Sequence, residues 1–200
     1  MRTLFLLALL MAASPSSAAS FDDPEWPCQQ RKVPSLTPGL MWAGPEITDR
    51  IRQLETDPDI QAIAAQLALR RIPIEDAEKM IDDFAKGLGA DKSDKLTAVF
   101  DQAFTLINQE RNAVMSGIAR YAKTQTELSK SIETKRTEIR NLKAQENPNL
   151  DKLEEMEDTL IWDERIFKER RQSLIYVCET PVILEKRIFA ISRALQSHLE

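Results

Sequence analysis

The chain has 200 residues, with 27 Lys and Arg against 32 Asp and Glu, and a net charge of −5. This mild acidity argues against a nucleic-acid partner, because nucleic-acid-binding domains concentrate positive charge. The length suits either one domain with a real core or one compact base with a projection.

Residues 1–19 are predicted to form a secretory signal peptide. Arg2 precedes an apolar run that is far shorter than the roughly 20 residues of a membrane-spanning helix. Small residues follow, so that cleavage after Ala18 or Ala19 fits the small-x-small rule. We therefore expect a periplasmic or secreted protein without an integral membrane segment.

Residues 20–45 are rich in proline and are predicted to form an extended strap. Proline lacks a backbone donor and disfavours helix at the residue before it. The segment is too apolar for a free linker, and Trp26 and Trp42 would anchor it along the helices. The alternative is that it is a ligand for an aromatic groove on another protein.

Cys28 in the strap and Cys178 are the two cysteines of the chain. In an oxidising compartment, two cysteines most simply form one disulfide. We expect this bridge within a single chain, where it would hold the strap beside the last helix. Pairing between two chains and a thiol metal site are the alternatives.

Residues 46–89 are predicted to form a base of short helices. Prolines stand at the three expected helix starts: Pro45, Pro58 and Pro73. Asp57 is the N-cap of the second helix, and Gly87 would end the third.

Residues 91–199 carry two apolar stripes that predict a long antiparallel helical hairpin. Each stripe alternates spacings of three and four residues, which is typical of a coiled-coil seam. The stripes are mirror images about a turn whose tip is expected near 147–148, with Leu128 opposite Phe167. The predicted fold class is all-α: a long coiled-coil hairpin on a small helical bundle, with a proline-rich N-terminal strap.

The first hairpin helix has a second apolar face that ends near Ala122. The hairpin beyond that point is therefore expected to project as a two-helix arm. Basic residues on one arm helix lie opposite acidic residues on the other, which favours a role in antiparallel orientation over binding of phosphate or anionic lipid. Pro181 is expected to kink or restart the second helix.

No residue pattern indicates an enzyme, and we predict no catalytic residue, no cofactor and no metal site. His198, the single histidine, lies two residues from the C-terminus. No catalytic triad, zinc-binding HExxH motif or phosphate-binding glycine loop occurs in the sequence.

Ile161, Trp162 and Ile166 form an apolar patch on the arm that the seam does not use. Leu160 and Phe167 already occupy the seam at this level. An exposed aromatic patch on a charged arm is a candidate partner-binding site. The strap or an identical subunit could cover it instead.

The sequence thus predicts an exported helical interaction protein that acts through its arm. We expect an accessory or assembly factor of an envelope complex, with an envelope protein as partner and homodimerisation left open. The outline is similar to the helical hairpins of periplasmic adaptors in efflux and secretion systems, but their β-rich segments are absent and no family is assigned. The alternative is a small-ligand or metal-binding protein with a pocket in the base near Trp26, Trp42 and Met115.

Overall fold

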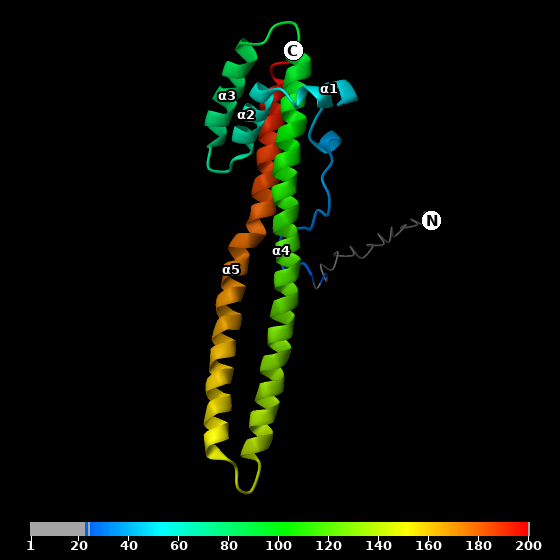
Figure 1. The fold of residues 1–200 in the computed structure, drawn as a ribbon. Helices are drawn as coiled ribbons and strands as arrows, with labels where there is room; N and C mark the ends of the chain where they lie inside the picture. Colours follow the sequence, from blue (N-terminus) through cyan, green and yellow to red (C-terminus); the bar gives the residue numbers. More distant parts are fainter. Residues whose placement is uncertain (1–22, 24, 200) are drawn as a thin grey trace, which may run out of the picture.

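The computed structural model describes residue 23 and residues 25–199, so the predicted signal peptide lies outside the described residues. A short 3-10 turn and five α-helices follow one another: η1 (Pro38–Leu40), α1 (Asp49–Leu54), α2 (Pro58–Ala68), α3 (Ile74–Lys86), α4 (Lys92–Lys143) and α5 (Leu150–Gln196). No strand occurs in this part of the chain. The predicted all-α fold is confirmed: a long helical hairpin stands on a small bundle (Figure 1).

The two long helices, α4 and α5, run antiparallel and dominate the molecule (Figure 1). At about 1.5 Å per residue, the 52 residues of α4 extend over roughly 78 Å. The turn between the helices contains the predicted tip at 147–148. Asn149 caps α5, because its side chain accepts a 3.0 Å hydrogen bond from the backbone nitrogen of Lys152.

Contacts across the hairpin agree with the predicted register to within one helical turn. The Gln125 side chain donates a 3.2 Å hydrogen bond to the backbone oxygen of Phe167. Lys135 and Asp163 form an ion pair of 2.5 Å. Both contacts join adjacent layers of the predicted seam, so the mirror-image pattern describes how the helices meet.

The base buries apolar side chains from the short helices against the adjoining ends of α4 and α5. Fully buried members come from four of these helices: Ile60, Ile81, Leu96 and Leu184. Trp42 of the strap stacks on Phe100 of α4, with ring centroids 4.4 Å apart and planes inclined by 12°. The strap therefore belongs to the core of the base.

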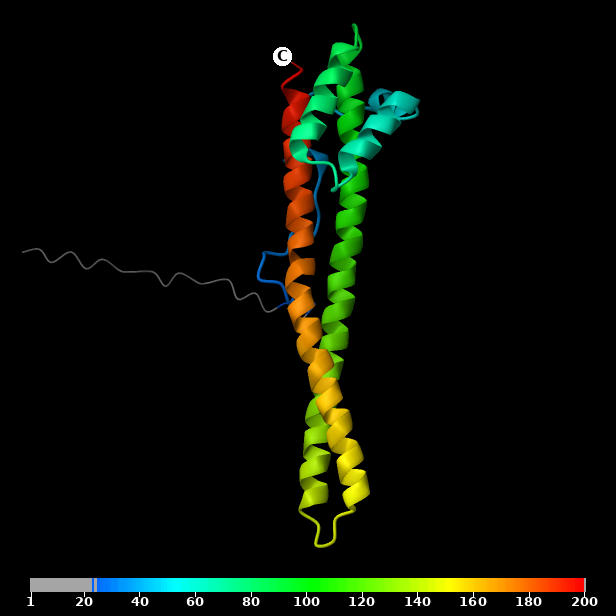
Figure 2. The ribbon, with the colours of Figure 1, turned by 90° about the vertical axis from the view of Figure 1, so that its left-hand side faces the viewer.

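The arm, residues 123–143 of α4 and 150–172 of α5, consists of the two long helices alone among the described residues (Figures 1 and 2). Ile132 and Ile139 are its buried residues on α4, and burial on α5 begins only at Cys178. The arm thus has a narrow seam, as the end of the second apolar face near Ala122 predicts.

The first short helix begins later than predicted. The sequence places its start at Pro45, whereas α1 begins at Asp49. The indole of Trp42 donates a 2.8 Å hydrogen bond to the backbone oxygen of Pro45, which a helix starting there would use for its first turn. The stacked tryptophan therefore holds this segment in a non-helical conformation.

The other predicted helix boundaries agree more closely. Asp57 caps α2 by accepting a hydrogen bond of 2.9 Å from the backbone nitrogen of Asp59. Gly87 ends α3 in a right-handed conformation, with φ of −80°, so the left-handed glycine cap is not used. α5 continues through Pro181 without a restart, and its orange segment bends in Figure 1.

Candidate functional site

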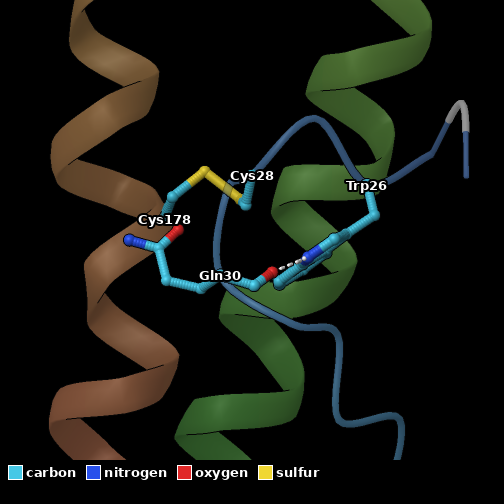
Figure 3. Close-up of a disulfide and its surroundings, with 4 residues drawn as sticks. All are labelled: Trp26, Cys28, Gln30 and Cys178. Carbon is cyan, nitrogen blue, oxygen red and sulfur yellow. Dashed lines mark hydrogen bonds between the residues drawn. A yellow bond between two sulfur atoms is a disulfide. The ribbon is translucent and has the colours of Figure 1, made fainter. Parts of the chain in front are cut away.

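The strap and the last helix meet at Cys28 and Cys178, the residues that the sequence predicts to pair. Their sulfur atoms lie at disulfide distance, and their Cα atoms are 5.5 Å apart (Figure 3). The Trp26 indole donates a 2.7 Å hydrogen bond to the backbone oxygen of Gln30. Trp26, both cysteines and Met115 belong to one small buried cluster between the base and the arm.

Arg111 of α4 lies close to this cluster and has no exposed surface. Its Nε atom is 2.7 Å from a carboxylate oxygen of Glu185 on α5. Its Nη2 atom donates to the backbone oxygen of Val33 in the strap. Arg111 therefore connects the strap with both long helices.

The predicted partner-binding residues lie on the arm, where the structure leaves two of them open. Ile161 is 64% exposed and Trp162 is 60% exposed. Ile166 is partly buried. No described residue of the strap covers the two exposed side chains, since the strap runs along the other half of the hairpin (Figure 1). The hairpin itself therefore does not need them for its seam.

The exposed apolar surface of α5 extends beyond the patch that the sequence indicates. Ile175 and Tyr176 are 62% and 76% exposed. They follow Ile161 and Trp162 by 14 residues, two heptads, and so lie on nearly the same side of the helix. We call these four residues the outer stripe of α5. The heptad spacing from Ile161 and Trp162 is the sequence signal that indicates Ile175 and Tyr176.

The companion helix α4 has no exposed large hydrophobic side chain, and every residue of α4 is described. The arm is therefore asymmetric, with apolar surface on α5 alone. Exposed apolar surface of this kind is a candidate site for contact with another molecule.

The basic run on α4 of the arm, which includes Lys135, Arg136 and Lys143, forms ion pairs with acidic residues of α5. Arg136 lies 2.7 Å from Glu164, and Lys143 lies 2.5 Å from Glu157. These contacts confirm that the basic run faces acidic residues of α5. They reduce the positive charge that would be offered to phosphate or anionic lipid.

A carboxyl pair lies in the base, where Glu55 at the end of α1 meets Asp101 of α4. One carboxylate oxygen of Glu55 is buried without a hydrogen-bond partner. Burial raises the pKa of Glu55 to about 7, and the hydrogen bond and negative charge of Asp101 act in the same direction. The nearby Arg52, 3.6 Å from Asp101, opposes this shift.

Trp26, Trp42 and Met115, which the sequence places near a possible ligand pocket in the base, do not belong to one cluster. Trp26 and Met115 lie in the cluster around the cysteines, whereas Trp42 lies in the core of the base. All three side chains are buried. Two pockets of the base lie elsewhere, one between α3 and α5 and one between α2, α3 and the start of α4.

Two further findings bear on the chemistry of the described residues. They contain no group of three or more His, Cys, Asp or Glu side chains arranged to hold a metal ion. Their helices include none that is both long and apolar enough to cross a membrane. His198 is not free in solvent, since its Nε2 atom lies 2.7 Å from Asp82 of α3.

Comparison with known proteins gives no relative: no family model matches the chain, and no curated protein or solved structure is similar to it.

Proposed function

We propose that this protein is an exported helical interaction protein that acts as an accessory or assembly factor of an envelope complex. In this proposal its signal peptide directs it to the periplasm or the exterior. The base and the strap form a rigid platform, and the arm together with the adjoining turn of α5 presents the outer stripe to a partner protein.

One observation carries the proposal: Trp162 and Ile161 are exposed on a helix whose seam is complete without them. Exposed tryptophan adds little to folding, whereas burial of tryptophan at an interface commonly contributes about 2 kcal/mol or more to binding. The heptad spacing from Ile161 and Trp162 to Ile175 and Tyr176, which lie just beyond the arm, supports a helical partner that follows α5.

Site-specific photocrosslinking in cells of the source organism tests this proposal. A photoreactive amino acid at Trp162 should give one discrete crosslinked species with an envelope protein. The same group at Thr134, an exposed position on α4 of the arm, is the matched control and should give none.

Two outcomes would contradict the proposal. Equal crosslinking from Trp162 and Thr134 would mean that the outer stripe has no special role. A species twice the mass of the chain would assign the stripe to an identical subunit, and the protein would be a homodimer with no separate partner at this site.

A further inference from the structure

A pocket of about 300 Å³ lies in the base between the start of α3 and α5, far from the tip of the arm. In Figure 1, α3 stands beside the red part of α5. Apolar and cationic residues line the pocket in equal number: Ile74, Ile183, Ala190, Arg70, Lys186 and Arg187. No carboxylate lines it, although the chain contains 32 Asp and Glu residues.

Arg187 is the buried member of this set, with 8% of its surface exposed. Its Nε atom donates a 2.7 Å hydrogen bond to the backbone oxygen of Leu67, and Nη1 donates one of 2.8 Å to that of Ile72. Leu67 lies in the last turn of α2, where carbonyl groups have no helical donor. Arg187 therefore closes the end of α2, which is a structural role.

That role leaves part of the guanidinium group without a partner. The Nη2 atom is buried and makes no hydrogen bond, and no carboxylate among the described residues lies within 4.0 Å of Arg187. Burial lowers the pKa of Arg187, yet an arginine side chain keeps its charge in proteins. An uncompensated positive charge therefore lies at the wall of the pocket.

The two other cations of the pocket add to this charge. Lys186 is exposed, and no carboxylate of the described chain forms an ion pair with it. The positive charge of Arg70 is partly compensated by Glu110, which lies 2.9 Å from the Arg70 Nε atom. Glu110 does not line the pocket. The first turn of α3 carries Glu75 and Asp76, and neither lines the pocket. Asp76 is paired with Lys79 at 3.0 Å.

We propose that this pocket binds a small amphipathic anion, a carboxylate carried on a short apolar chain. The chain would lie on Ile74, Ile183 and Ala190, whose burial favours binding. The carboxylate would lie between Lys186 and Arg70, in the field of Arg187. A neutral apolar ligand would leave the charges of Lys186 and Arg187 without a partner, and an organic cation would be repelled.

Two kinds of ligand carry a carboxylate next to a short apolar chain: a free short-chain fatty acid, and an apolar peptide with a free C-terminus. Either would occupy a site separate from the outer stripe of α5. The inference therefore stands independently of the proposed function.

Isothermal calorimetry on the folded chain, without its signal peptide, tests the inference with octanoate as the probe. Octanoate should bind saturably, and octanol, octylamine and acetate should bind at least about tenfold more weakly, because each lacks the negative charge or the chain. An apolar tripeptide with a free carboxylate and the same peptide as its amide distinguish the two kinds of ligand. The acid form of the peptide binding more tightly than octanoate would assign the site to peptides, and the reverse order to fatty acids.

Variants of α5 locate the site. Lys186→Gln removes an exposed charge that no fold contact uses, and it should weaken binding of octanoate about tenfold. Lys168→Gln, an exposed lysine on the arm, is the matched control and should bind as the original chain does. The inference is overturned if neither octanoate nor the peptide acid binds, if octanol binds as tightly as octanoate, or if both lysine variants bind like the original chain.

Discussion

At the scale of single residues, the polar groups of the hairpin and the base explain more of the structure than the apolar pattern alone. Arg111 is fully buried in the seam, where it contacts Glu185 and the backbone oxygen of Val33. Buried arginines of this kind specify one arrangement of the elements, because any other would leave the charge unpaired. Arg111 thus fixes where the strap lies on the hairpin.

Glu55 gives the protein a defined dependence of stability on pH. Its pKa is about 7 in the folded chain, above its ordinary value of 4.5, because burial and Asp101 disfavour the charged form. The folded state therefore holds the proton more tightly than the unfolded chain. The contribution of Glu55 to stability is most favourable below pH 4.5 and is lost as the pH rises through about 7.

The variant Glu55→Gln cannot ionise, so it should be more stable than the original chain at pH 8 and should show a flatter pH profile between about pH 5 and 8. Urea unfolding across a pH series measures both quantities. Glu46→Gln, at an exposed position in the chain, should leave the profile unchanged. Parallel profiles for Glu55→Gln and the original chain would disprove the assignment.

Arg187 is the residue that the sequence could least reveal. The three-and-four spacing assigns Leu184 and Ile188 to the seam and leaves Arg187 beside it, where a charged residue is normally exposed. Its burial depends on the carbonyl groups of Leu67 and Ile72, about 120 residues earlier in the chain. A contact over that separation cannot be inferred from one local pattern.

At the scale of elements, the sequence predicted the long helices better than the short ones. The hairpin repeats its apolar pattern many times, so one irregular residue does not obscure it. A six-residue helix such as α1 has no repeat, and its start depends on the hydrogen bond between Trp42 and Pro45. Pro181 does not restart α5, which continues through it and bends in its orange segment in Figure 1.

The register of the hairpin can be tested with pairs of introduced cysteines. Leu128→Cys combined with Phe167→Cys should react efficiently with a short bis-maleimide, because these residues lie opposite in the seam. Leu128→Cys combined with Glu157→Cys should react poorly, since Glu157 lies more than two turns away and pairs with Lys143. Mass spectrometry of the digested protein measures the yields. Preferential reaction of the second pair would show that the register is wrong.

At the scale of the whole molecule, the protein has two parts that differ in burial. The base has an apolar core from five helices and the strap, whereas the arm has a narrow seam and paired surface charges. The Cys28–Cys178 bridge lies where the two parts meet and closes a sequence separation of 150 residues. In the chain-entropy model, such a loop contributes about 5 kcal/mol to stability.

This division suits an interaction protein, because the base can hold the arm rigidly while the arm reaches a partner. The sequence predicted the arm and the patch at Trp162, since the seam was complete without that residue. The seam pattern does not indicate Ile175 and Tyr176, because both residues lie outside the seam. The spacing of apolar residues shows where a helix is exposed, but it does not show which protein binds there.

The most direct test of the account is the stability of Trp162→Ala, measured by urea unfolding beside the seam variant Phe167→Ala. We expect Trp162→Ala to change the free energy of unfolding by no more than about 0.5 kcal/mol, because its side chain is 60% exposed. Phe167→Ala should lose about 2 kcal/mol or more, since it removes a large seam side chain. A loss for Trp162→Ala as large as that for Phe167→Ala would contradict the account, because Trp162 would then belong to the core of the arm and not to a docking surface.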